Sequence, residues 1–471
     1  MRSHDTDPMP TPGTPPPRRA ARPLNRSLVL AAVLHGLVYF LLLPAWMGED
    51  EPWHFEYVRD LTQSQELSVE DDSPAPADLQ LSPSQQQIQE RTGASPEFVL
   101  RTQREIADSM RREHFWRRVD FAGWEHGAVD LNHFVRDHTE AGQPPFYYAT
   151  SAALLRMLRI DSVDAQLWFL RFLSLLAYLA LIFITLELAW LATADEWVAV
   201  VAAVFVAILP MHARQAAMVN NDVLVKVFSS AALLCGARVV IGRGARLSVA
   251  AMAIFALLAI MTKPTAIGLV APICFAIVVL TCRGRSLLVS LAVGSLTALT
   301  LAALAVLYWN SNSSGSLPDL SDPAHHLAWV SSPKFYRQLL STFVGTFNWQ
   351  MRRLPTEVYS AAGIALGIGL LGSVFALLRG ADGQRRKILA LCWLAFLSQL
   401  FAMGLRGYAT GRYLFPVLPA LATLLALGWL VPLRSSWRPR GTAVLISVLI
   451  VFDGYAIWNG LVRHQYMVWG S

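Results

Sequence analysis

Charged residues are scarce in this sequence, making up 15% of its 471 residues. A soluble globular protein carries about a quarter. This shortage, together with 54% hydrophobic residues, excludes an ordinary soluble protein and indicates an integral membrane protein. Cysteines are also few, and all four lie inside or at the ends of apolar runs: Cys235, Cys274, Cys282 and Cys392. No disulfide framework is therefore expected.

The net charge of +6 does not indicate a nucleic-acid partner. Its basic residues stand in short clusters between apolar runs, as the positive-inside rule produces. Residues 1–25 are rich in proline and arginine and are expected to form a disordered cytoplasmic tail. The apolar run that follows has no small-residue cleavage site, so it is predicted to remain as an anchor.

Eleven apolar runs approach the length of about 20 residues that a spanning helix needs. The segment Pro144 to Ile160 is the ambiguous one. If it does not span, every basic cluster faces the cytoplasm; if it spans, the later clusters all move outside. We therefore predict a juxtamembrane helix there and spans at Ser27–Trp46, Ala165–Leu191, Val198–Pro210, Val223–Ile241, Leu247–Met261, Ala266–Thr281, Leu287–Trp309, Val358–Leu378, Ile388–Leu405, Leu414–Val431 and Thr442–Trp458.

This topology predicts an all-α polytopic protein with two large external loops. After the tail 1–25 it has a transmembrane module 26–309 that includes the external loop 47–164, a second external loop 310–357, and C-terminal helices 358–471. The first loop contains a Gln/Ser/Pro-rich insert, which we expect to be solvated. A helix should follow it, with Ser95 as N-cap and Phe98, Ile106 and Met110 on one side.

Basic residues on the outer face run against the general charge trend. They could be snorkelling side chains, or they could form a cationic rim that holds a lipid phosphate at headgroup depth. The spans themselves contain few ionisable groups, of which His35, Glu187 and Asp453 stand out. A coupled transporter would concentrate charge near the midplane, so this distribution favours an enzyme at the interface. The basic residues of the outer face are Arg171, Arg214, Lys263, Arg406 and Arg412.

Acidic residues of the same face follow the first span in "GEDEPWHFEY". Glu49 is expected to be a solvated helix end, whereas Asp50 and Glu51 are candidates for chemistry. His54 stands four residues after Asp50 and would share a helix face with it. Asp222 either caps a span, with Lys226 as a partner four residues on, or joins the same site.

The ordered motifs of the chain resemble those of GT-C glycosyltransferases, the membrane enzymes that use polyprenyl-phosphate-linked sugars. Within that superfamily the chain is most similar to a bacterial multi-span family of predicted membrane proteins with largely unassigned activity. The resemblance extends from about Asp50 to Leu421. It rests on "DEPWHFEY", "QPPFYYATSAALL", "LRFLSLL", "VNNDVLVKVFSSAAL", "TKPTAIGL", "STFVGTFNWQMRRLP" and "TGRYLFPVLPAL".

The resemblance implies Asp50 as catalytic base, Glu51 and Asp222 as further acids of the site, and Lys263 and Arg412 as ligands of the donor phosphate. Arg171 and Arg406 are further phosphate candidates, because cations can neutralise a phosphate leaving group. Two departures, Asn348 where glycine is common and the longer insert, leave acceptor specificity open. Supporting residues are predicted to be His54, Gln143, Tyr147, Asn221, Tyr413 and Trp349.

The predicted reaction moves a sugar from a polyprenyl-phosphate donor to a hydroxyl of a glycan, lipid or protein acceptor, with inversion. It would take place on the external face of a bacterial inner membrane, among membrane lipids. No cofactor is certain, although Asp50, His54 and Asp222 could bind a divalent metal. A transporter or flippase, or a polymerase or ligase for lipid-linked saccharides, is the alternative.

Overall fold

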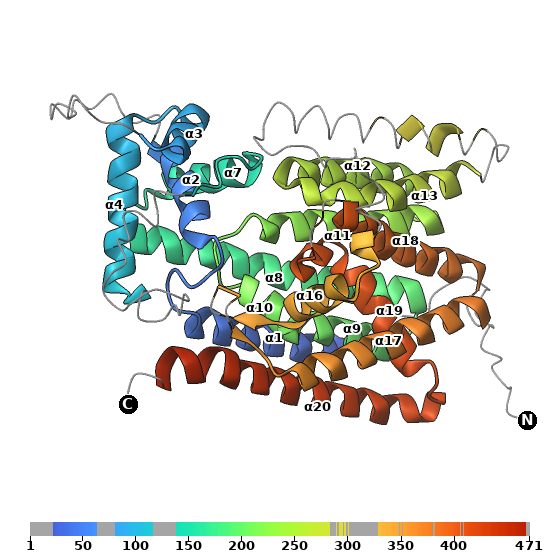
Figure 1. Cartoon of the computed structure of the whole chain (residues 1–471). Helices are drawn as coiled ribbons and strands as arrows, with labels where there is room; N and C mark the ends of the chain where they lie inside the picture. Colours follow the sequence, from blue (N-terminus) through green and yellow to red (C-terminus); the bar gives the residue numbers. More distant parts are fainter. Residues whose placement is uncertain are drawn as a thin grey trace, which may run out of the picture.

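The structure, a computed structural model, describes residues 22–63, 81–115, 138–282, 328–379 and 382–467, except 348, 351, 406 and 408. A few helical positions between 289 and 300 are also described. Within these residues nearly every element is a helix, and the long apolar helices lie side by side in one bundle (Figure 1). The predicted all-α polytopic fold is thus confirmed.

Seven described helical segments are long and apolar enough to cross a membrane. They comprise α8 (Val163–Thr193), α11 (Asp222–Ile241), η2 with α13 (Pro264–Leu269, Val270–Thr281), α17 (Thr356–Arg379), α18 (Gly383–Leu405), η3 with α19 (Gly411–Val417, Leu418–Leu430), and α20 (Arg438–Ile457) with η4 (Ser435–Trp437) and η5 (Trp458–Met467).

Three shorter apolar helices correspond to further predicted spans: α1 (Arg22–Leu42), α9 (Glu196–Ile208) and α12 (Ala245–Thr262). The remaining predicted span, Leu287–Trp309, lies largely outside the described residues. How many of these helices cross the membrane stays a prediction. All four cysteines are free, as expected.

Helix α9 is short but lies in the centre of the bundle. Every residue from Val198 to Ile208 is buried, as expected for a helix that is apolar on all sides. Pro210 cannot donate a backbone hydrogen bond, so the chain begins a new short helix there, α10 (Pro210–Gln215). This kink brings Arg214 and Gln215 to the end of the bundle where the first external loop lies.

Four helices of the loop that was predicted to be the first external one gather at that end, at the upper left of Figure 1. They are α2 (Glu51–Gln63), α3 (Pro83–Thr92), α4 (Pro96–Arg112) and α7 (Phe146–Leu158). Helix α7 has 13 residues, about 20 Å of helix, which is too short for a hydrocarbon core of about 30 Å. Its predicted position in the outer interface is not tested.

The helix predicted after Ser95 is confirmed as α4. The Ser95 hydroxyl accepts a hydrogen bond from the backbone N–H of Phe98, and Phe98, Ile106 and Met110 are buried. The expectation of a solvated insert is wrong for its second half, which forms α3. There Ser82 and Gln85 make a capping box, and Ile88 is fully buried because α3 packs on α2 and α4.

The predicted second external loop contributes α16 (Pro333–Val344) and an antiparallel hairpin of β1 (Thr346–Phe347) and β2 (Arg352–Arg353). Helix α16 lies against η3, where Gly411 leaves no room for a side chain: a Cβ atom there would be 2.3 Å from the Phe343 backbone nitrogen. The Gly411 N–H donates to the Thr342 hydroxyl at 2.6 Å. This close contact fixes the backbone just before Arg412.

The ionisable side chains inside the bundle are paired with one another. His35 Nε2 lies 2.7 Å from Asp453 Oδ2, and the Tyr39 hydroxyl donates to Asp453 Oδ1 at 2.9 Å. Glu187 forms an ion pair with Arg238 at 3.6 Å. These pairs tie α20 to α1 and α11 to α8.

Candidate active site at one end of the helix bundle

The candidate site starts at the turn between α1 and α2. Asp50 adopts φ +60°, an unfavourable conformation for a non-glycine residue that costs about 1–3 kcal/mol and clusters at functional sites. Its backbone carbonyl accepts a hydrogen bond from the His54 N–H at 3.0 Å, so Asp50 and His54 lie together as predicted. With a side chain that is 30% exposed, Asp50 is the most accessible acid of the turn.

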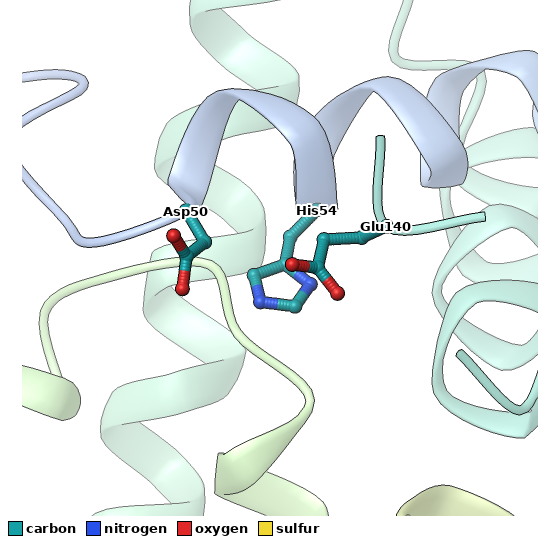
Figure 2. A group of neighbouring side chains, drawn as sticks. All are labelled: Asp50, His54 and Glu140. Atoms are coloured by element: carbon teal, nitrogen blue, oxygen red, sulfur yellow. The ribbon is translucent and has the colours of Figure 1, made fainter. Parts of the chain in front are cut away.

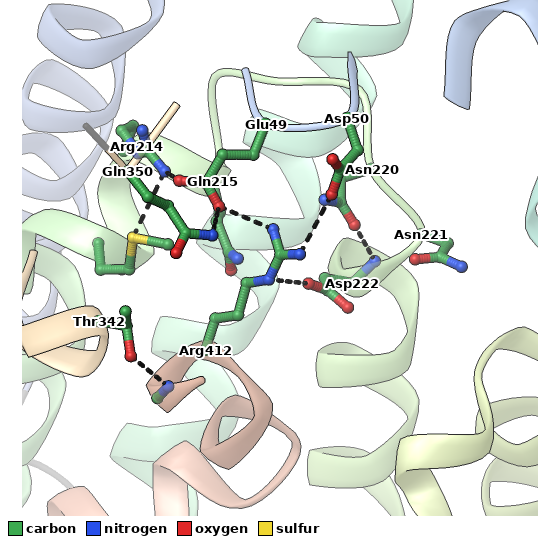
Figure 3. A network of polar contacts seen from close by, with 12 residues as sticks. Glu49, Asp50, Arg214, Gln215, Asn220, Asn221, Asp222, Thr342, Gln350 and Arg412 are labelled. Carbon is green, nitrogen blue, oxygen red and sulfur yellow. Dashed lines mark hydrogen bonds and ion pairs between the residues drawn. The ribbon is translucent and has the colours of Figure 1, made fainter. Parts of the chain in front are cut away.

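Glu49 is not the solvated helix end that the sequence suggested. Its side chain is buried between two arginines: it pairs with Arg214 and accepts from Arg412 Nη1 at 2.9 Å (Figure 3). Gln350, from the β1–β2 turn, donates to it at 2.8 Å. Burial alone would raise the pKa of Glu49, but the two arginines lower it below its usual range.

Glu51 and Arg171 form an ion pair with each other, which argues against their predicted roles in catalysis and in phosphate binding. Arg171 donates to both Glu51 carboxylate oxygens, at 2.8 and 2.6 Å, and to the carbonyls of Leu43 and Pro44. Glu51 also accepts from the backbone N–H groups of Gly48 and Val219. Both side chains are fully buried, so neither is free for catalysis or for a phosphate.

Arg412 lies at the centre of the site (Figure 3). Its Nη2 donates to Asp50 Oδ2 at 3.2 Å, and its Nε is 3.8 Å from Asp222 Oδ2. Lys263 donates to Asp222 Oδ1 at 2.5 Å and to Asn221 Oδ1 at 3.1 Å. The structure thus brings together Asp50, Asp222, Lys263 and Arg412, which the sequence had assigned to one site from four distant segments.

Asp222 is the first residue of α11, and Asn221 precedes it at the cap position. The alternative in which Asp222 caps this helix and pairs with Lys226 is therefore wrong. Lys263, from the start of η2, is its partner instead, and Lys226 donates to Gln215 Oε1 at 2.9 Å. Arg406 lies outside the described residues.

Several buried donors around Arg412 have no hydrogen-bond acceptor among the described residues. Because a buried donor without an acceptor is costly and uncommon, the group indicates a place for an acceptor-rich ligand. The donors come from α10, η3 and the turn before α11. They are Arg214 Nε and Nη1, Gln215 Nε2, Asn220 Nδ2, Asn221 Nδ2 and Arg412 Nε.

A second group of side chains has the composition of a metal site. Asp50, His54 and Glu140 each offer a ligand atom within 4.8 Å of the others (Figure 2). The His54 Nδ1 atom lies 2.8 Å from the Tyr148 hydroxyl, a contact that would leave Nε2 for a metal if Nδ1 carries the proton. Glu140 replaces the predicted ligand Asp222, which lies with Lys263 and Arg412 instead. Two carboxylates and an imidazole suit a divalent ion.

The environment keeps this group in the charge state that a metal requires. Burial lowers the pKa of His54, so its imidazole is neutral near pH 7. Burial would raise the pKa of Glu140, but His54, a hydrogen bond from His138 and Lys263 lower it to about 2. Sequence reasoning missed Glu140, since no local pattern distinguishes it from other loop acids.

The remaining predicted supporting residues surround these groups. The Tyr413 ring lies 5.4 Å from Lys263 Nζ and 5.6 Å from the Arg412 guanidinium carbon. Trp349 packs edge-on against Trp53 at 5.4 Å. Gln143 donates its backbone N–H to the Glu140 carbonyl, and Tyr147 hydrogen-bonds to the backbone of Asn220.

An apolar cavity of about 420 Å³ lies beside the site, between α7, α8 and α11. Tyr147 and Val223 line it. Val223 follows Asp222 in the chain, and Tyr147 contacts the backbone of Asn220. Most of its wall is aliphatic or aromatic, including Leu154, Leu173 and Phe228. It is suited to hold a hydrocarbon chain whose polar end reaches the charged cluster.

The family of predicted membrane proteins designated DUF2142 matches residues 33–421, most of the chain and all of the site described above. This chain belongs to that family. No curated protein matches it.

Solved structures with similar folds are membrane glycosyltransferases of the GT-C superfamily. An oligosaccharyltransferase, AglB from Archaeoglobus fulgidus, in complex with an inhibitory peptide and a dolichol-phosphate, has a TM-score of 0.52 and 13% identity over 94% of this chain and 56% of its own. ArnT from Cupriavidus metallidurans, bound to undecaprenyl phosphate, has a TM-score of 0.47 and 16% identity over 93% and 65%. This chain thus spans about three fifths of their length, and the likeness to AglB shows a shared fold.

Proposed function

We propose that this protein is a membrane glycosyltransferase that moves a sugar from a polyprenyl-phosphate donor to an acceptor hydroxyl, on the external face of a bacterial inner membrane. One observation carries the proposal: an accessible carboxylate, Asp50, lies against a buried cluster of cations with unsatisfied donors. An apolar cavity adjoins that cluster. In this proposal the carboxylate is the base, the cation cluster binds the donor phosphate, and the cavity holds the lipid chain.

The phosphate of the donor would bind at Arg412 and Lys263. A sugar on a phosphate already has a good leaving group, so the site must neutralise the charge that grows on the phosphate oxygen as its bond to the anomeric carbon breaks. Both cations are buried, where an ion pair is stronger than in water. The polyprenyl chain would leave through the adjoining apolar cavity.

The acceptor hydroxyl would be deprotonated by Asp50 as its oxygen attacks the anomeric carbon. One carboxylate oxygen of Asp50, Oδ2, is held by Arg412, and its Oδ1 makes no hydrogen bond to the described residues, so it can take the proton. The C–O bond to the phosphate breaks as the new bond forms on the opposite face. A single displacement of this kind inverts the anomeric centre.

Asp50, His54 and Glu140 would hold a divalent metal, if the enzyme uses one. Bound there, the metal would supply positive charge beside the reacting oxygens. We expect Glu140→Gln to weaken Mn²⁺ or Zn²⁺ binding at least tenfold in isothermal titration of the detergent-solubilised protein. The matched change Glu357→Gln, on the exposed start of α17, should leave it unchanged, and equal affinity of both variants would remove Glu140 from the site.

The test of function is transfer from undecaprenyl-phosphate-linked labelled sugars to extracted envelope glycans and lipids by purified protein in detergent. Asp50→Asn should lower the transfer rate by about 10²–10⁴, the usual contribution of a general base, while donor binding is retained. Asp161→Asn, an exposed external change, is the control. Full transfer by Asp50→Asn would refute the assignment of the base. Movement of the donor across vesicles without transfer would favour the flippase alternative.

A further inference from the structure

Lys226 differs from the other buried cations of the site in forming no ion pair with a described carboxylate. Arg171, Arg214 and Lys263 each form an ion pair with a carboxylate, and Arg412 forms three. Lys226 is 3% exposed, yet no described carboxylate pairs with it. Its Nζ donates to Gln215 Oε1 and lies 5.5 Å above the Phe415 ring.

A buried ammonium group without a counter-charge is costly. Lys226 offers three N–H donors, and the described contacts use one. Its partner Gln215 presents an Nε2 group without an acceptor, and Arg412 Nε makes no hydrogen bond to the described residues either, since Asp222 Oδ2 is 3.8 Å away. This surplus consists of donors and positive charge, so the complementary ligand is an anion rich in acceptor oxygens.

The position of Lys226 connects that anion to a lipid. Lys226 lines a small void with Ser174, Tyr178 and His212, and Ser174 and Val223 also line the apolar cavity of about 420 Å³. On α11 the neighbours Val223 and Val227 face that cavity. A hydrocarbon chain in the cavity would therefore place a phosphate head group within reach of the ammonium.

The charges of the site indicate which phosphate it takes. Apart from Glu140, which pairs with His138, its charged side chains are five cations, Arg171, Arg214, Lys226, Lys263 and Arg412, and four carboxylates, Glu49, Asp50, Glu51 and Asp222. One positive charge is left, and it belongs to Lys226. A sugar phosphodiester carries one negative charge, whereas a diphosphate carries two, so the monophosphate form is the electrically matched ligand.

We propose that Lys226 binds the donor phosphate directly and makes the site selective for polyprenyl monophosphates over diphosphates. This inference rests on the proposed function and adds to it a ligand residue and a donor class. The ammonium contacts a non-bridging phosphate oxygen, and Gln215 Nε2 donates to the same group. Arg412 and Lys263, already paired with carboxylates, hold the phosphate from the other side.

The test is binding of an undecaprenyl-monophosphate-linked sugar, an undecaprenyl-diphosphate-linked sugar, phosphatidylglycerol and inorganic phosphate to the full chain in detergent. Wild type should bind the monophosphate at least tenfold more tightly than the diphosphate, and the other two far more weakly. Lys226→Gln should weaken monophosphate binding about 30-fold, and Lys226→Arg should restore most of it. Lys387→Gln, an exposed lysine on α18, should bind as wild type does.

Thermal unfolding of each variant shows whether it is folded. Weaker binding supports the inference only when the variant is folded. Unchanged monophosphate binding by folded Lys226→Gln would overturn the inference, and so would equal binding of monophosphate and diphosphate by wild type. In both cases the proposed function would stand, provided Arg412→Gln loses binding. If wild type binds neither polyprenyl phosphate, the proposed function fails as well.

Discussion

The two halves of helix α2 carry buried acids that are neutralised in opposite ways. Glu51 at its start is paired with Arg171, and Glu49, in the turn just before the helix, is paired with Arg214 and Arg412. Two turns later, Glu56 and Asp60 are equally buried but form no described ion pair, and both Asp60 oxygens have no hydrogen-bond partner among the described residues.

This difference shows which of the buried acids are ionised and which are protonated. Burial raises the pKa of Glu56 well above its usual range, and the neighbouring Asp60 raises it further. Burial also raises the pKa of Asp60 to about 8, against the opposing effects of Thr102 and Arg59. The start of α2 is therefore an ionised site, whereas the acids further along are protonated near neutral pH and serve packing against α3 and α4.

The largest expected effect is the difference in stability between two Glu→Gln variants, one in each half of α2. Glu51→Gln leaves Arg171 buried without its counter-charge and should cost about 3–5 kcal/mol. Glu56→Gln replaces a neutral carboxylic acid by a neutral amide and keeps an oxygen for Gln103, so it should change stability by less than about 1 kcal/mol. Thermal unfolding of both variants in detergent measures this, and similar losses would break the comparison.

A smaller effect should appear as a pH dependence of stability. The folded Asp60 carboxyl, with a pKa of about 8, holds its proton up to about pH 8, whereas the ordinary pKa of an aspartate side chain in an unfolded chain is 3.8. The folded state thus binds an extra proton between these values, and stability falls as pH rises through this window. Asp60→Asn cannot ionise, so it should gain about 1–3 kcal/mol over wild type between pH 6 and pH 8.

Unfolding of wild type and Asp60→Asn at pH 6 and pH 8 tests this. Asp108→Asn, half exposed on α4, should follow wild type at both values. Parallel behaviour of Asp60→Asn and wild type would mean that Asp60 is ionised when folded, and the contrast between the two halves of α2 would disappear.

The smallest effect concerns the helix that covers the protonated acids. Ser95→Ala removes the N-cap of α4 and should lower stability by about 1 kcal/mol. Helix α4 carries Thr102 and Gln103, which lie against Asp60 and Glu56. Ser95→Asp should restore the loss. A larger loss of transfer activity than of stability in Ser95→Ala would show that α4 also positions the site.

Local patterns in the sequence predicted much of the fold. Apolar runs gave the long helices, and Ser95 with Pro96 marked the start of α4, because both signals lie within a few residues. The second half of the insert was mispredicted, since its polar composition hides the buried Ile88 and the packing of α3 on α2.

The site was predictable only in part. The resemblance brought Asp50, Asp222, Lys263 and Arg412 together, and the structure shows them in contact, although their roles stay predictions. What the sequence could not show is which acid takes which cation. Glu49 looked solvated because its partners lie 165 and 363 residues further along the chain, and Arg171 looked available because its partner Glu51 is 120 residues away.

The position of Glu49 also has a consequence for biosynthesis. Its carboxylate emerges with the first helix, but Arg214, Gln350 and Arg412 are made much later. Since a chain is inserted from its N-terminus onward, the charged cluster is incomplete until translation has passed residue 412. A nascent or truncated chain that ends before these residues therefore carries the Glu49 carboxylate without its arginine partners.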